Sequence, residues 1–173
     1  MAISEPLSLP VVKDFRQFTF RPLDIVGLAV NQFNRRQQVQ DHGGDGWYAE
    51  ISLPPMERAD AEAWNCFLLK CRGTKRTFLM GHPLGRVPRG SVAGAPVVDA
   101  AGQKGFELDL RGFLANAQGV LLEGDFLQIG NYLYKNLDNV NADANGKATL
   151  NIYPSLRVSP SDAAPIITTN PVG

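Results

Sequence analysis

The chain has 173 residues, and its 17 lysine and arginine residues balance 17 aspartate and glutamate residues. This length is sufficient for one domain with its own hydrophobic core, which we take to span residues 1–173. The balance of charge disfavours a protein that coats DNA or binds an anionic membrane, because both roles depend on an excess of basic side chains.

At the start of the chain, the segment MAISEPLSLP lacks the charged start and apolar run of a secretory signal. No later segment has the ~18 consecutive apolar residues of a membrane-spanning helix. We therefore expect synthesis in the cytoplasm and no membrane insertion.

Residues 15–53 have the patterns of β-structure. FRQFTFRP (15–22) alternates imperfectly and should end at its proline, and DIVGLAV (24–30) is a second apolar run in which the glycine suits a bulge. The glycines of DHGGDG predict a turn after NRRQQVQ. WYAEISL (47–53) alternates cleanly, so we expect a strand with one buried face that includes Trp47.

Residues 57–72 have the clearest helical signal in the chain. Acidic residues occupy the first turn, where the helix dipole favours them, and Gly73 suits the left-handed stop. The helix carries an apolar stripe, of which we expect Trp64, Phe67 and Leu68 to pack on a sheet and to belong to the core together with Trp47. The stripe consists of Ala59, Ala63, Trp64, Phe67, Leu68 and Cys71.

The two cysteines, Cys66 and Cys71, lie five residues apart on this helix. Their side chains diverge by about 140°, so a disulfide would break the helix. We expect Cys71 in the core and Cys66 nearer its edge.

The second half of the chain returns to β-structure. RTFLM (76–80) predicts a short strand, and the glycine- and proline-rich residues 81–96 predict a long loop. The alternation in GFELDLRGF (105–113) directs its aromatic and leucine side chains, Phe106 among them, inward.

The last part of the chain predicts two more strands, a hairpin and an extended tail. VLLEGDFLQIGNYLYKNL (120–137) supplies two strands, and residues 140–154 form a hairpin at Asn145 and Gly146, the strongest turn signal present. The proline-rich residues 156–173 should cover the surface as extended chain or as an edge strand. The predicted fold is mainly β with one helix, as a split or closed antiparallel β-barrel or sandwich.

No motif predicts catalysis, a cofactor or a metal. NADANG imitates a calcium loop, but Ile152 occupies the position where a bidentate glutamate is needed. Ser91 lacks the flanking glycines of a nucleophile elbow, and His42 and His82 have no third ligand near them in the sequence. Folding could bring two carboxylates together as a catalytic pair, and the sequence alone does not reveal whether it does. We expect a protein that is not an enzyme.

Four arginines in predicted loops are candidates for a subunit interface: Arg35 and Arg36 in NRRQQVQ, and Arg86 and Arg89 in GRVPRG. Ordinary solvated loop charge explains them as well. Subunit contact is the functional alternative, because arginine forms planar bidentate pairs across interfaces.

Three motifs carry a resemblance that spans nearly the whole chain. The first is WYAEISLPP, the second is the helix segment AEAWNCFLL that follows it, and the third is GDFLQIG, which is followed by the late glycine-containing hairpin. In this order they resemble a family of small tail-tip structural proteins of bacteriophages and prophages. Glu57 departs from the serine or threonine expected as the helix cap.

The resemblance implies a ring-forming β-barrel protein at the tail tip, of the distal tail or baseplate-hub type. It implies a homo-oligomer, as a hexameric ring, that contacts the tube, hub and tape-measure proteins and lets DNA pass in transit. The protein would be assembled in the cytoplasm of the host bacterium and located in the tail of the virion. No catalytic residue comes with the resemblance.

Three other functions stay open. Within the same class, the protein could form the ring that terminates or completes the tail tube. A carbohydrate-binding, receptor-recognition module would use Tyr132 and Tyr134 as an aromatic platform, although cross-strand packing also accounts for them. A cell-wall hydrolase would need a carboxylate pair in a cleft.

Overall fold

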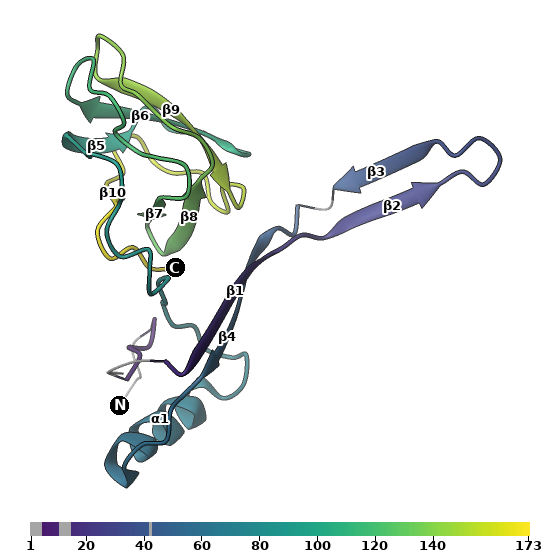
Figure 1. Ribbon diagram of the computed structural model, residues 1–173, viewed down its shortest axis with the longest axis vertical. Helices are drawn as coiled ribbons and strands as arrows, with labels where there is room; N and C mark the ends of the chain where they lie inside the picture. Colours follow the sequence, from purple (N-terminus) through teal and green to yellow (C-terminus); the bar gives the residue numbers. More distant parts are fainter. Residues whose placement is uncertain (1–4, 11–14, 42) are drawn as a thin grey trace.

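The computed structural model describes residues 5–10, 15–41 and 43–173, and the predicted fold class is confirmed. Within these residues the protein is mainly β, with one helix and one nearly closed barrel (Figure 1). His42 lies outside the described residues.

Six antiparallel strands form the barrel, in the order β10-β7-β8-β9-β6-β5. At the seam, the backbone N–H of Val98 donates to the carbonyl of Ala164 at 3.0 Å, and the N–H of Ala163 donates to the carbonyl of Val98. These bonds join β5 to the chain just before β10, so the sheet closes on itself and has little free edge. The strands are β5 (Gly94–Val98), β6 (Glu107–Phe113), β7 (Phe126–Ile129), β8 (Tyr132–Asn136), β9 (Lys147–Tyr153) and β10 (Ile166–Ile167).

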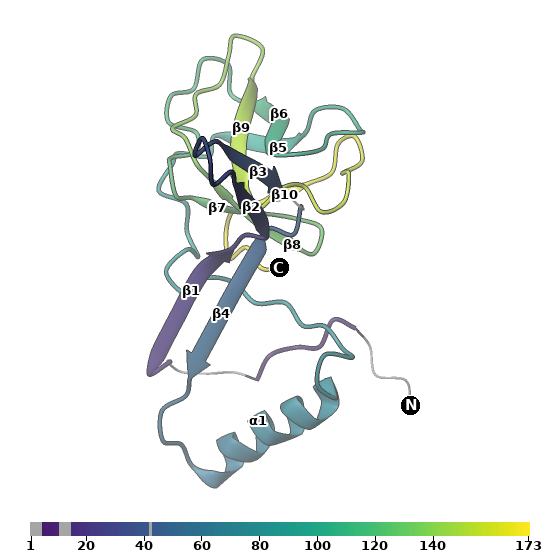
Figure 2. The same cartoon turned by 90° about the vertical axis from the view of Figure 1, so that its right-hand side faces the viewer.

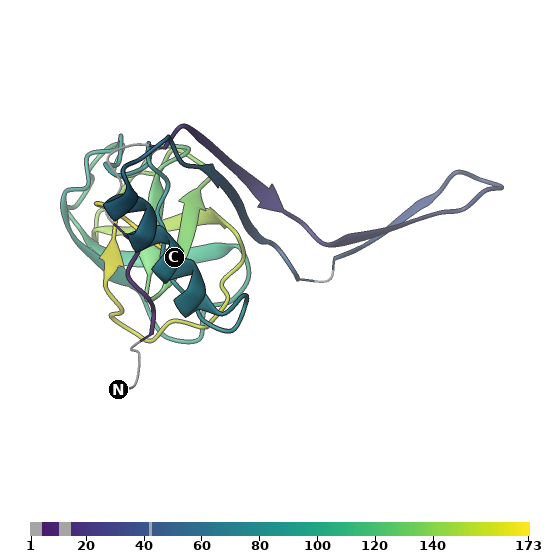
Figure 3. The same cartoon turned by 90° about the horizontal axis from the view of Figure 1, so that it is seen from below.

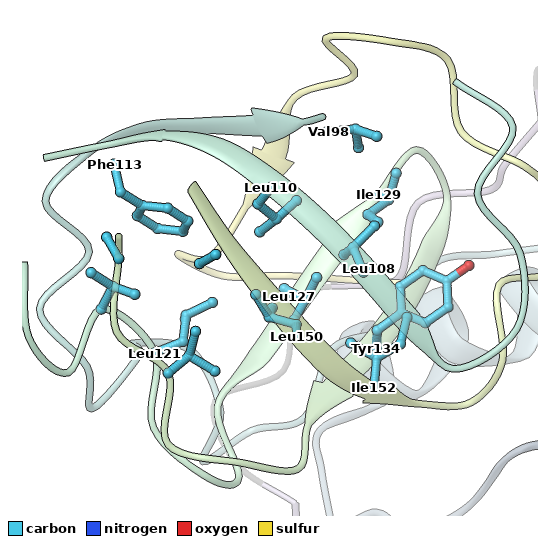
Figure 4. Close-up of a cluster of buried hydrophobic side chains, with 14 residues drawn as sticks. Val98, Leu108, Leu110, Phe113, Leu121, Leu127, Ile129, Tyr134, Leu150 and Ile152 are labelled. Carbon is cyan, nitrogen blue, oxygen red and sulfur yellow. The ribbon is translucent and has the colours of Figure 1, made fainter. Parts of the chain in front are cut away.

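The interior of the barrel holds the main hydrophobic core (Figure 4). Alternate residues of β6 and β9 point inward, as the period of two requires. Each large side chain buried here contributes roughly 1.5–3 kcal/mol. The fully buried side chains include Leu108, Leu110, Leu121, Leu127, Tyr134, Leu150 and Ile152.

A long, bent β-hairpin leaves the barrel, and we call it the arm. Its root consists of β1 (Gln17–Leu23) paired with β4 (Gly46–Ser52), and its distal half consists of β2 (Val26–Val30) paired with β3 (Gln37–Asp41). The root lies near the barrel, whereas the distal half projects away from it (Figures 1 and 3).

Helix α1 (Arg58–Cys71) confirms the predicted helix. It ends through left-handed backbone at Arg72 and Gly73. Figure 2 shows that α1 lies at the end of the molecule opposite the barrel, with the root between them. Within the described part of the chain, no helix has the length and apolar character needed to cross a membrane.

The prediction that α1 packs on a sheet is wrong. Phe67 and Cys71 are buried against Leu7, in a small second core beside the half-buried Leu9 and Trp64. Leu68, which we assigned to the core, is exposed. The helical period correctly predicted which apolar residues lie on one side of α1. Only a short N-terminal segment covers that side, so Leu68 at its edge stays exposed to solvent.

Three strand predictions are also corrected. Pro22 does not end β1, because a two-stranded root has free edges on which a missing N–H is tolerated. Residues 37–41 form β3 although their sequence is polar, and β2 pairs with it without a bulge at the glycine. Residues 76–80 contribute only a single bridge between Phe78 and Leu7.

In the barrel, the predicted loop 81–96 ends earlier, because β5 begins at Gly94. Phe106, expected inward, precedes β6 and is exposed. Residues 141–146 form a turn rather than a hairpin of their own, since β9 pairs with β6 and β8. The tail does supply an edge strand, β10.

Candidate functional site

The distal half of the arm has one apolar face. Residues opposite each other in an antiparallel pair point to the same side, so the register of β2 and β3 decides the composition of each face. One face has Val26, Leu28, Val30 and Val39, all of them exposed, with Gln37 opposite Val30 at its distal end. The other face has Gly27, Ala29, Gln38 and Gln40.

The tip of the arm is a closed turn that presents a phenylalanine. The side-chain oxygen of Asn31 accepts the N–H of Phe33 at 2.9 Å, and that of Asn34 accepts the N–H of Arg36 at 3.0 Å. Arg35 adopts left-handed backbone with a φ of 56°. The side chain of Phe33 is 99 % exposed, the most exposed large hydrophobic side chain among the described residues.

Such a hairpin gains little stability from its own contacts. Two-stranded hairpins are marginal in water, and exposed apolar faces of soluble proteins commonly mark interaction sites. The strands of the distal half also carry no lysine or proline that would protect their edges. These features indicate a surface that another molecule covers.

Hydrogen bonds hold the root of the arm on the barrel. The indole N–H of Trp47 donates to the carbonyl of Leu133 at 2.9 Å. The hydroxyl of Tyr153 lies within 3.1 Å of the carbonyl oxygens of Leu23 and Gly46 and of the carboxylate of Asp24. Burial, and then the nearby Asp24 carboxylate, raise the pKa of Tyr153, so the hydroxyl stays protonated as a donor.

Asp45 provides a second attachment at the bend of the arm. Its carboxylate is buried, at 6 % exposure, and accepts hydrogen bonds from both the backbone N–H and the hydroxyl of Ser155. The guanidinium of Arg157 donates to the backbone carbonyl of Asp45. A buried carboxylate that accepts two hydrogen bonds in this way is costly to remove.

Aromatic rings fill the space between root and barrel. Phe20 stacks on Trp47 with ring centroids 4.7 Å apart, and His82 stacks on Phe126 at 5.1 Å. The His82 ring also meets Phe20 edge-on at 5.2 Å. Burial, and then the positive charge of Lys135, lower the pKa of His82, so the neutral ring is favoured in this cluster.

Next to these rings lies an open apolar cavity of about 290 Å³. It is bounded on one side by the root and on the other by β8. The lining includes Phe20, Trp47, Ala49, Met80, Tyr132 and Leu133.

The four predicted interface arginines fall into two separate groups. Arg35 and Arg36 lie at the tip of the arm, and Arg86 and Arg89 lie in the loop before β5. Arg89 is engaged within its own chain, since its backbone N–H donates to the Asp125 carboxylate at 2.8 Å and its guanidinium donates to the carbonyl of Glu123. Arg35 and Arg36 lie beside the exposed Phe33, whereas Arg86 lies beside the exposed Leu84 and Val87.

The other residues that we singled out have internal roles. Tyr134 is buried in the barrel core, so it cannot form an aromatic platform with the exposed Tyr132. In NADANG, the Asp143 carboxylate accepts the backbone N–H groups of Asn145 and Lys147 at 2.7 and 2.8 Å. Among the described residues, no group of three or more histidine, cysteine, aspartate or glutamate side chains is placed to hold a metal ion.

Comparison with known proteins returned no match, either to a protein family or to a curated protein.

Sequence reasoning did not identify the arm. Its signal was the short run QQVQ, whose single valine pairs with Leu28 of β2 across the turn. A polar strand of this kind is recognisable only together with its partner strand.

Proposed function

We propose that this protein is a non-enzymatic structural component of a bacteriophage tail. It assembles as a homo-hexameric ring at the tail tip, where it links the tail tube to the adsorption apparatus and leaves a passage for DNA. It contacts other tail proteins above and below and is located in the virion.

The apolar face of the arm carries this proposal. It projects away from its own barrel, so a second molecule is needed to cover it (Figure 3). A contact between the arm of one copy and a different surface of the next copy is heterologous, and repetition of such a contact by a closing rotation gives a ring.

Two further features support the choice of a tail ring. The barrel has almost no free edge of its own, which leaves the arm as the part that pairs with neighbours. The net charge of zero suits a passage that lets DNA through without binding it. The phage assignment and the hexamer rest on the resemblance of the three sequence motifs.

The purified protein and the phage particle test the proposal together. Negative-stain microscopy and light scattering should show six-membered rings, and antibody labelling should place the protein at the tail tip. Labelling at the head-proximal end of the tail would instead support the tube-terminating ring. A protein that stays monomeric at high concentration and is absent from virions would refute both placements.

A further inference from the structure

The tip of the arm and the cavity beside its root have matching properties. Among the described residues, none covers the side chain of Phe33, which is almost fully exposed, and none fills the apolar cavity. Its volume of about 290 Å³ exceeds the ~150 Å³ that holds a benzene ring in an engineered protein cavity. A phenylalanine side chain therefore fits it with space for adjacent atoms of the arm.

A chain cannot fill its own cavity with its own arm. Trp47 lines the cavity and is fixed to the barrel by its bond to Leu133, so the root holds its direction. From this root the distal half runs away from the barrel (Figures 1 and 3). The occupant must then come from a different molecule.

Charge favours this cavity over its larger neighbour. A second cavity of about 570 Å³ lies near α1, but Arg86 and His82 line it. Arg86 would face Arg35 and Arg36 of the inserting tip, and like charges in contact are unfavourable. Among the described residues that line the smaller cavity, the one cation is Arg157, and its guanidinium is already engaged as a donor to the backbone carbonyl of Asp45.

We propose that Phe33 of one copy inserts into the cavity lined by Trp47 and Ala49 of the next copy. This inference rests on the proposed self-assembly and names the surfaces that make it. Burial of an aromatic side chain in an apolar pocket is the usual form of a strong interface contact. Because tip and cavity are different surfaces, the contact is heterologous and can close a ring.

Two variants each remove one half of the contact. Phe33→Ala removes the aromatic side chain but leaves the cavity intact. Ala49→Trp fills the cavity but leaves the side chain of Phe33 intact. Both positions are exposed, so neither change disturbs a core. Matched controls are Gln32→Ala at the tip and Glu50→Trp, which adds the same bulk on the opposite face of β4.

Each of the two variants should raise the dissociation constant of an interface by about ten- to a hundredfold, measured by light scattering across a concentration series. The controls should assemble like the wild type. An equimolar mixture of Phe33→Ala and Ala49→Trp has one intact contact per pair and should give heterodimers that do not grow into rings. The double variant should assemble no better than either single variant, because all three lack the same contact.

Fluorescence reports the contact directly. The chain has two tryptophans, so a Trp64→Phe background leaves Trp47 as the reporter in the cavity wall. Assembly should shift its emission to shorter wavelength, and Phe33→Ala should abolish the shift.

If both variants form rings as readily as the wild type, and assembly does not shift the Trp47 emission, this inference is overturned and the tail-ring proposal stands. A wild type that is monomeric and absent from virions would overturn the two together.

Discussion

Leu28 and Val39 lie directly opposite each other across β2 and β3, and their side chains are 60 % and 63 % exposed. In the core of the protein, such a cross-strand pair of aliphatic side chains would be covered by a second layer. Here the pair lies at the centre of an apolar face that projects from the molecule. The predictions below separate the role of this face from the stability of the barrel.

The first prediction concerns that pair. Leu28→Ser together with Val39→Ser should raise the concentration needed for assembly by at least about tenfold, since each apolar side chain buried contributes roughly 1.5–3 kcal/mol. The free energy of unfolding of the single chain should change by less than about 1 kcal/mol, because both residues are exposed. Light scattering and urea unfolding measure the two effects.

The matched control is Gln38→Ser with Gln40→Ser, which alters the opposite face of the same hairpin. It should assemble normally. Equal loss of assembly in the two double variants would show that pairing along the strand edges, and not the apolar face, makes the contact.

The second prediction concerns the attachment of the arm at Asp45. Asp45→Ala leaves the partly buried backbone N–H of Ser155 without its acceptor, which costs about 1–3 kcal/mol of stability. Hydrogen exchange of the root strands should increase, whereas that of β6 and β9 should not. Asp138→Ala, at an exposed carboxylate on the barrel, serves as the control, and an equal loss of stability there would argue against a specific role of Asp45.

The third prediction compares two glycines with left-handed backbone. A Cβ atom at Gly146, where φ is 70°, would lie 2.2 Å from the carbonyl oxygen of Phe113, whereas one at Gly102, where φ is 89°, would meet nothing within 4 Å. Gly102→Ala should therefore cost only the backbone strain of about 1–2 kcal/mol. Gly146→Ala should cost clearly more, as measured by thermal unfolding. Equal costs would mean that the turn before β9 moves freely to make room.

The fourth prediction concerns pH. Because the pKa of His82 is lowered in the folded protein, the unfolded chain binds the proton more readily. Its contribution to stability is full above the ordinary pKa of about 6.5 and is lost as the pH falls from there through the lowered pKa. Protonation would also remove the acceptor for the N–H of Leu84, which donates to His82 Nδ1 at 3.2 Å.

Urea unfolding at a series of pH values should show this loss, and His82→Phe, which keeps an aromatic ring, should reduce it. His42→Asn controls for the second histidine in the chain. A pH dependence that is unchanged by His82→Phe would refute the assignment.

Local sequence patterns predicted the parts of the fold that local chemistry controls. The helix from Arg58 to Cys71 follows from its acidic first turn and the glycine after it. The inward leucines of β6, Leu108 and Leu110, follow from a period of two. For the candidate site, the sequence identified Arg35 and Arg36 as exposed loop residues but did not show that their loop is the tip of a projecting arm.

The tertiary structure decided which apolar faces are buried and which are exposed. The run from Val26 to Val30 has the composition of a buried strand, yet its face is exposed, and Tyr134 shares a strand with Tyr132 but points into the core. The attachment of Asp45 to Ser155 joins residues 110 positions apart in the sequence. In regular elements such as β6 and α1, the sequence by itself determines which side chains share a face, because that depends on the backbone period. What lies against the face depends on contacts between distant segments, which only the folded chain establishes.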